Sequence, residues 1–264
     1  MADPDFVGVL LARIARWRQP GLYTIGICGA QGSGKSTLVA ALAEQLVLRG
    51  VRTATLSLDD LYRTRTQRMH LAKEVHSLFA VRGVPGTHDL ALGRETLDAV
   101  KRGEPAPLPR FDKASDDRMP IADWPRAPHG TQVLLLEGWC LGAAPQEEKA
   151  LAQPVNELER DEDPDCRWRG HVNAALAGDY QRLFERVNRL VFLAAPSWDV
   201  VATWREEQEA GLRGQGGTAV MSPAEVSRFI QHYERLTRHI VATMPDYADL
   251  TVRLDERRAV TSVS

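Results

Sequence analysis

The sequence predicts an α/β fold in which helices cover both faces of an open, parallel sheet of five strands. Short apolar runs rich in β-branched residues stop at glycine or charged residues, and longer segments with helical spacing separate them. Strands that are apolar along their whole length are typical of parallel sheets buried on both faces. The predicted strands are residues 23–30, 51–58, 131–138, 189–195 and 250–255.

Three helices are marked clearly in the sequence. Residues 5–18 place four large apolar side chains on one face, and we expect this helix to dock on the domain and not on a membrane surface. Residues 37–50 follow the first strand and end at a glycine. A third helix begins at a capping box of Ser222 and Glu225, with Pro223 at the first helical position. Its apolar stripe is expected to pack in the core.

Two irregular segments interrupt the pattern. Residues 103–130 contain many prolines and predict an ordered but irregular connection, while residues 143–167 are acidic and predict a mobile surface excursion. Neither marks a domain boundary, so we expect residues 1–264 to form a single domain. A length of 264 residues with 44% hydrophobic content fits that expectation.

Composition excludes several function classes. A net charge of −2 argues against a general nucleic-acid binder. No apolar run is long enough to cross a bilayer, and nothing resembles a signal peptide. The three cysteines lie far apart without a C-x-x-C pair, which predicts reduced thiols in a cytoplasmic protein. We therefore expect no nucleic-acid or membrane partner, and the sequence leaves the oligomeric state open.

The stretch GAQGSGKS, residues 29–36, matches G-x-x-x-x-G-K-[ST] between a predicted strand and a predicted helix. Such a loop turns backbone N–H groups toward phosphate oxygens, and the helix N-terminus adds positive charge. The pattern predicts a three-layer P-loop NTPase that binds a nucleoside triphosphate and Mg²⁺; a merely structural glycine turn is the disfavoured alternative. Lys35 is also expected to act in catalysis at the β- and γ-phosphates. The expected phosphate-binding residues are Gly29, Gly32, Ser33, Gly34, Lys35, Ser36 and Thr37.

Carboxylates end two of the predicted strands. Glu137 closes the run VLLLEG and, with the Ser36 hydroxyl, is the expected magnesium site, although a carboxylate there could also be merely solvated. Asp59 and Asp60 follow the second strand in SLDDLYRTRTQR, residues 57–68. Phosphoryl transfer to an alcohol needs a carboxylate that orients the hydroxyl and accepts its proton, and parallel sheets collect ligands at their carboxyl ends. One of the two aspartates could instead be a turn residue.

The chain lacks the N-K-x-D motif of GTPases and an LSGGQ-like motif of transporter ATPases. Its SLDDLY segment resembles the S-x-D-x-F-Y segment of the uridine kinase, phosphoribulokinase and pantothenate kinase superfamily, with Leu61 where Phe is usual. Four further segments are similar to D-glycerate 3-kinase of the plant and fungal type and its bacterial relatives. They are VRGVPGTHDL (81–90), PRFDKASDDR (109–118), LLLEGWCLG (134–142) and PSWDVVATWREEQEAGLR (196–213).

The resemblance implies transfer of the γ-phosphate of ATP to D-glycerate, giving 3-phospho-D-glycerate, on a parallel sheet with a helical lid. Asp59 takes the place of the base by this match. Residues 204–221 would form the lid, with Arg205 and Arg213 as catalytic arginines; a helix with exposed arginines is the alternative.

A small hydroxy acid also needs a cationic or multi-donor clamp for its carboxylate. Lys113 is favoured for the acceptor site because lysine is rare here, with five among 33 basic residues. Arg63, Arg65 and Arg118, each taken singly, could equally well be solvated surface residues as substrate ligands. His88 could equally be a structural histidine. The candidate substrate-binding residues are Asp60, Tyr62, Arg82, His88, Asp89, Lys113 and Arg118.

Two other functions remain open. A kinase of the same fold could act on a nucleoside, on pantothenate or on a sugar phosphate. The chain could also be an ATP-binding regulatory module without turnover, which the combined presence of Lys35, Ser36, Asp59 and Glu137 disfavours, because a pure binder needs no base.

Overall fold

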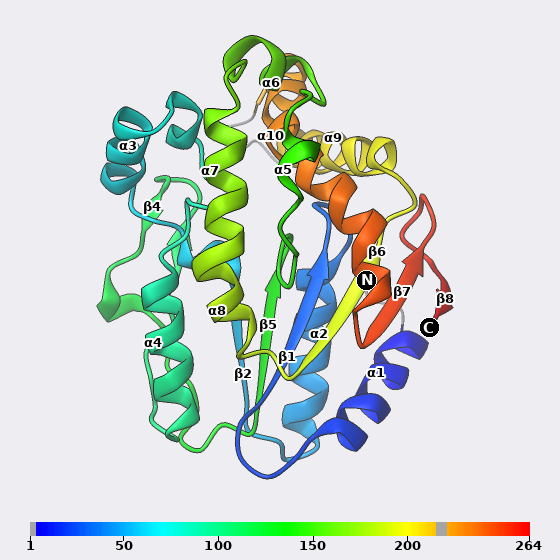
Figure 1. Ribbon diagram of the computed structural model, residues 1–264. Helices are drawn as coiled ribbons and strands as arrows, with labels where there is room; N and C mark the ends of the chain where they lie inside the picture. Colours follow the sequence, from blue (N-terminus) through cyan, green and yellow to red (C-terminus); the bar gives the residue numbers. More distant parts are fainter. Residues whose placement is uncertain (1–3, 215–220) are drawn as a thin grey trace.

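A six-stranded sheet forms the centre of the protein in the computed structural model, which describes residues 4–214 and 221–264 (Figure 1). The first five strands of the sheet are parallel, which confirms the predicted fold class and all five predicted strands. In spatial order the strands are β2 (Thr53–Ser57), β5 (Val133–Gly138), β1 (Tyr23–Gly29), β6 (Arg189–Ala194), β7 (Leu250–Leu254) and β8 (Val260–Val263).

The prediction of five strands is wrong in one respect, because β8 adds a sixth strand that runs antiparallel to β7. This strand is four residues long and mostly exposed. It therefore lacks the apolar run by which a buried strand is recognised in a sequence.

Side chains on the two faces of the sheet enter two separate apolar layers. Ile25 and Ile27 of β1 pack with α1 and α2, whereas Cys28 packs with helices of the opposite layer. In Figure 1, α2 lies behind the sheet, and α8 and α10 lie in front of it. This is a three-layer α/β/α arrangement. The helices named here are α1 (Pro4–Trp17), α2 (Lys35–Leu48), α4 (Leu90–Lys101), α8 (Gln181–Phe184), α9 (Trp198–Gly214) and α10 (Pro223–Thr243).

The predicted helix ends agree closely with the structure. The capping box of α10 is formed in full, since the Ser222 hydroxyl accepts the Glu225 N–H and the Glu225 carboxylate accepts the Ser222 N–H. Across the ranges that the structure describes, every helix is too short or too polar to cross a membrane.

The long connection after β2 builds one wall beside the carboxyl edge of the sheet. An isolated antiparallel bridge between Tyr62 and His88 joins its beginning to the start of α4. The only regular elements of the predicted irregular segment 103–130 are a hairpin of two strands, each two residues long, and one short turn of helix. The elements before α4 are η1 (Leu58–Leu61), α3 (Arg65–Glu74) and η2 (Ser77–Ala80), and those after it are β3 (Phe111–Asp112), β4 (Asp117–Arg118) and η3 (Ile121–Asp123).

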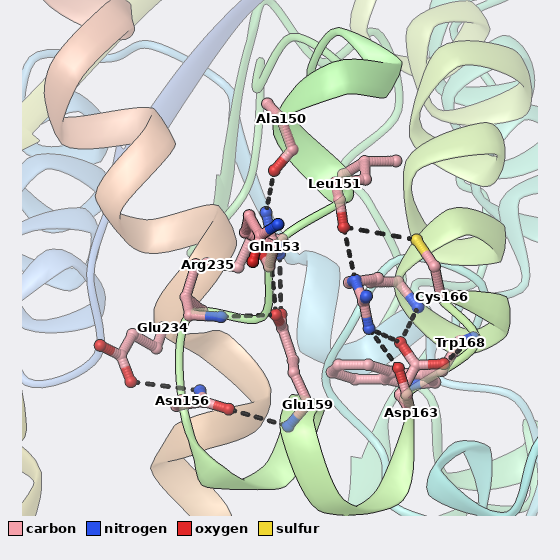
Figure 2. A network of polar contacts seen from close by, with 12 residues as sticks. Ala150, Leu151, Gln153, Asn156, Glu159, Asp163, Cys166, Trp168, Glu234 and Arg235 are labelled. Carbon is pink, nitrogen blue, oxygen red and sulfur yellow. Dashed lines mark hydrogen bonds and ion pairs between the residues drawn. The ribbon is translucent and has the colours of Figure 1, made fainter.

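The expectation of a mobile excursion at residues 143–167 is wrong. The segment forms α5 (Glu148–Leu151) and α6 (Glu157–Glu162), and it continues into α7 (Arg167–Ala175) and the π-helical turn η4 (Leu176–Tyr180). Two of its acidic side chains, Glu159 and Asp163, are fully buried. Figure 2 shows why: Glu159 pairs with Arg235 of α10, and the Asp163 carboxylate accepts hydrogen bonds from the start of α7.

Candidate active site

The loop between β1 and α2 has a backbone path that favours glycine. Gly32 and Gly34 have φ angles of 77° and 85°, in the left-handed region. A Cβ on Gly32 would lie 2.7 Å from the Cβ of Trp204, and one on Gly29 would lie 2.7 Å from the Ser33 hydroxyl. Because Gly34 caps α2 without a side chain, the first-turn amides can face an anion.

A cavity of about 550 Å³ opens on this loop. Its walls include Trp204 of α9, Leu254 of β7 and Arg258 of the C-terminal hairpin. The predicted phosphate-binding residues lie along it, apart from Gly29, which lies at the end of β1. The cavity is therefore large enough for a nucleotide and has its phosphate end at the start of α2.

Glu137, at the end of β5, lies beside Ser36 and Lys35. The Ser36 hydroxyl donates to Oε1 of Glu137 over 3.0 Å, and Nζ of Lys35 is 4.0 Å from Oε2. That Oε2 is buried and accepts no hydrogen bond from the part of the chain that the structure describes. A hydroxyl and a buried carboxylate with spare acceptor capacity are the hard oxygen ligands that Mg²⁺ takes in company with phosphate and water. The predicted pair Ser36 and Glu137 thus fits this ion.

Asp59 lies at the neighbouring strand end, in the first turn of η1. Its Oδ1 accepts the Tyr62 hydroxyl over 2.9 Å, and its Oδ2 is 2.7 Å from Nζ of Lys113. Burial favours the protonated form, but the charges of Lys113 and Lys35 outweigh it and lower the pKa of Asp59 to about 2. The side chain is 30% exposed. Asp59 is therefore a carboxylate at neutral pH that an acceptor can reach.

Tyr62 and His88 form a buried stack next to Asp59. Their ring centroids are 4.5 Å apart with an interplanar angle of 25°. Burial lowers the pKa of His88 to about 3, so its imidazole is neutral at physiological pH. Its Nδ1 is hydrogen-bonded to the Tyr180 hydroxyl, whereas its Nε2 has no partner among the described residues.

The remaining predicted substrate-binding residues lie on the same wall, and most of their polar groups hold the wall together. Arg82 pairs with Asp116, and Arg118 donates to the Asp89 carboxylate over 3.0 Å. Asp89 also caps α4 by accepting the Leu92 N–H.

Asp60 contacts the irregular segment through both carboxylate oxygens. One oxygen accepts the Phe111 N–H and the other accepts Arg110, each over 3.2 Å. Burial raises the pKa of Asp60 despite the adjacent Arg110. The two adjacent aspartates are thus in different environments: Asp59 is held ionised beside the open site, and Asp60 anchors residues 110 and 111.

The predicted lid is described only in part. Arg205 lies on α9, where its guanidinium stacks over the Phe229 ring at 5.3 Å and donates to Gln208. The backbone of Arg213 lies in the same helix, but its side chain falls outside what the structure describes. Residues 215–220 of the predicted lid also lie outside the described residues.

Two residues near the site are not among the predicted site residues. The Tyr233 hydroxyl of α10 donates to the Arg82 carbonyl over 3.1 Å, and the charges of Asp59, Arg82 and Arg205 all act on it. Its place in an apolar helical stripe hid it, because such a stripe is ordinary core. Arg258 donates to the Gly32 carbonyl over 2.7 Å and stacks on Trp204. It ends the stretch RLDERR (253–258), which the family resemblance predicts to lie near the adenine of the nucleotide.

Comparisons with known proteins agree with this geometry. The model of the "Phosphoribulokinase / Uridine kinase family" matches residues 24–147. The chain is 34% identical over 226 residues to the uncharacterized kinase mug58 of Schizosaccharomyces pombe, covering 80% of this chain and 78% of the relative. It is 31% identical over 252 residues to the chloroplastic D-glycerate 3-kinase of Arabidopsis thaliana, covering 89% of this chain but only 53% of the plant protein.

Among solved structures, the D-glycerate 3-kinase from Cryptococcus neoformans var. grubii superposes with a TM-score of 0.80 at 25% identity. The match covers 98% of this chain and 96% of the fungal chain. Together with the loop between β1 and α2, these likenesses show that the chain belongs to the phosphoribulokinase/uridine kinase family of P-loop kinases.

Proposed function

We propose that this kinase transfers the γ-phosphate of Mg-ATP to the hydroxyl of a small hydroxy acid, with D-glycerate as acceptor and 3-phospho-D-glycerate as product. One observation carries the proposal. The ionised, partly exposed Asp59 lies just after β2, Glu137 lies near the end of β5 and the phosphate loop follows β1, and these three strands are parallel neighbours. Base, metal ligand and phosphate loop therefore share one edge of the sheet.

In this proposal the phosphate loop amides and Lys35 hold the nucleotide phosphates. Ser36 and Glu137 would hold Mg²⁺, which supplies positive charge to the phosphate oxygens. Asp59 accepts a hydrogen bond from the acceptor hydroxyl and takes its proton. A carboxylate with a pKa of about 2 is a weak base. It therefore acts mainly by orienting the hydroxyl, and the proton moves late, as suits a loose transition state.

The choice of D-glycerate draws on two relatives whose names state that activity, one 31% identical and one with the same fold at 25% identity. We also place the reaction in the cytoplasm, because all three cysteines are free. Arg205 and Arg213 are proposed to close over the transferred phosphoryl group as part of the lid.

The test is ADP release from Mg-ATP with a panel of acceptors: D-glycerate, L-glycerate, uridine, pantothenate and ribulose 5-phosphate. Mass and chromatography identify the phosphorylated product and its isomer. D-glycerate-dependent formation of 3-phosphoglycerate supports the proposal. Product from another acceptor alone would keep the catalytic groups and overturn the acceptor. ATP binding without product from any acceptor would favour a module without turnover.

A further inference from the structure

Arg63 is a partly buried arginine whose charge has no partner in the described part of the chain. Its Nε is fully buried without a hydrogen bond, and no described carboxylate pairs with its guanidinium. Five other cations of this wall are paired: Arg68 and Arg82 with Asp116, Arg110 with Asp60, Lys113 with Asp59, and Arg118 with Asp89. Withdrawing an unpaired charge from water is unfavourable. An anionic ligand would supply the missing partner.

A second donor without a partner, the Nε2–H of His88, lies close to Arg63. The Tyr180 hydroxyl oxygen accepts the Gly86 N–H over 3.0 Å, so its hydrogen is available for Nδ1 of His88. A neutral imidazole that accepts at Nδ1 carries its proton on Nε2. This N–H is buried and has no partner within the described residues. The Arg63 guanidinium is near enough to act on the same imidazole, as is the Asp59 carboxylate.

Both donors lie around His88, on whose imidazole the charges of Asp59 and Arg63 both act. Arg63 follows Tyr62 directly, and the Tyr62 hydroxyl binds Asp59 while its ring stacks on His88. We propose that Arg63 and the Nε2–H of His88 bind the carboxylate of the acceptor while Asp59 binds its hydroxyl. This inference rests on the proposed function and gives the acceptor a definite chemical class. The acceptor is a short carboxylic acid whose hydroxyl lies within a few bonds of the carboxylate.

Steady-state kinetics with three variants tests the assignment at saturating Mg-ATP. Arg63→Met removes the charge and keeps an apolar stem, Arg63→Lys restores a point charge, and Arg65→Met is the matched control because Arg65 is exposed. Loss of a charge-assisted hydrogen bond should raise the KM for D-glycerate roughly 10- to 100-fold in Arg63→Met. Arg63→Lys should recover part of that loss, and Arg65→Met should behave like the wild type. The KM for ATP should stay within about twofold in all three.

A neutral substrate analogue separates recognition of the carboxylate from a general defect. D-glyceramide keeps the hydroxyls but lacks the anionic charge. Its KM should already be high in the wild type, and Arg63→Met should raise that KM little further. An unchanged KM for D-glycerate in Arg63→Met would overturn the proposal. Equal losses for the acid and the amide would do the same, because they would indicate a structural role.

Thermal unfolding tests the site without turnover. Because the Arg63 charge has no protein partner, Arg63→Met should have a Tm equal to or above that of the wild type. D-glycerate added with Mg-ADP should raise the Tm of the wild type and of Arg65→Met but not of Arg63→Met. If the wild type binds and uses only a neutral acceptor, with no shift from D-glycerate, the carboxylate subsite is wrong. If the D-glycerate shift occurs and depends on Arg63 although no D-glycerate is phosphorylated, the subsite stands and the proposed reaction fails.

Discussion

Asp59 is ionised across the physiological pH range, and its surroundings determine that state. Tyr62 and Lys113 each bind one of its oxygens, and of the nearby charges Lys113 lowers the pKa of Asp59 most. Sequence alone could place the aspartate at a strand end. It could not identify Lys113 as its partner, since the two residues are 54 positions apart.

Replacing Asp59 with Asn should lower kcat roughly 10²- to 10⁴-fold, the usual range for loss of a positioned acid–base group. The amide can still bind Tyr62, but it cannot accept the hydroxyl proton. Calorimetry should give an affinity for Mg-ATP close to that of the wild type, because Glu137 and Ser36 are unchanged. Turnover within a few-fold of the wild type would remove Asp59 from the mechanism.

Replacing Lys113 with Met should make the activity sensitive to acid. Burial then opposes the ionised form of Asp59 with less compensation, so the pKa of Asp59 rises from about 2. Since a protonated carboxyl group cannot take the proton of the acceptor hydroxyl, activity is lost as pH falls through that pKa. The acid limb of kcat/KM should therefore move to higher pH. Lys149→Met, at an 84% exposed site, is the control, and coincident profiles for the two variants would contradict this coupling.

At the scale of elements, the acidic segment 143–167 is held against α10 by a buried ion pair. Arg235 makes a two-point contact with Glu159 over 2.8 and 2.7 Å, and it also donates to the Ala150 carbonyl (Figure 2). Its side chain is 9% exposed and that of Glu159 is 1% exposed. Removing one member of such a pair leaves the other charge buried and unpaired, which is unfavourable.

We therefore expect Arg235→Met to lower the free energy of unfolding by about 3 kcal/mol. Arg238→Met, which removes a 53% exposed partner of Glu234 in the same helix, should change it by less than about 1 kcal/mol. Urea unfolding followed by circular dichroism compares the two variants. Equal losses of unfolding free energy would show that the buried Arg235–Glu159 pair contributes no more to stability than the exposed Arg238–Glu234 pair.

The sequence could predict those parts of the fold and site that depend on local pattern and parallel topology. The phosphate loop, Asp59 and Glu137 belong to this group, because each follows an apolar strand and parallel strands align their ends. Residues whose partners are distant could not be predicted. Glu159 meets Arg235 across 76 positions, and Tyr233 meets Arg82 across 151. The sequence therefore predicts a surface excursion for the acidic segment and core packing for Tyr233.

At the scale of the whole molecule, the nucleotide cavity joins segments from both ends of the chain. Phe6 of α1, the phosphate loop, α9 and the C-terminal hairpin all line it. Arg258 connects three of these segments. It donates to the Gly32 carbonyl and to Glu207 of α9, each over 2.7 Å, and stacks on Trp204 at 5.0 Å. The unpredicted strand β8 thus has a function in the fold, since its hairpin carries Arg258 to the phosphate loop.

Because Arg258 holds the loop and α9 together, Arg258→Ala should weaken Mg-ATP binding roughly tenfold, the value of about two lost hydrogen bonds. The neighbouring exposed Arg257 provides the matched control Arg257→Ala. Calorimetric titration of each variant with Mg-ATP gives the affinities. The KM for the acceptor should stay near that of the wild type, because Arg258 contacts the phosphate loop and α9 and not the acceptor residues around Asp59. Equal ATP affinity in the two variants would mean that the loop keeps its shape without this contact. The glycines of residues 29–34 and the packing of Gly32 against Trp204 would then suffice to define the nucleotide site.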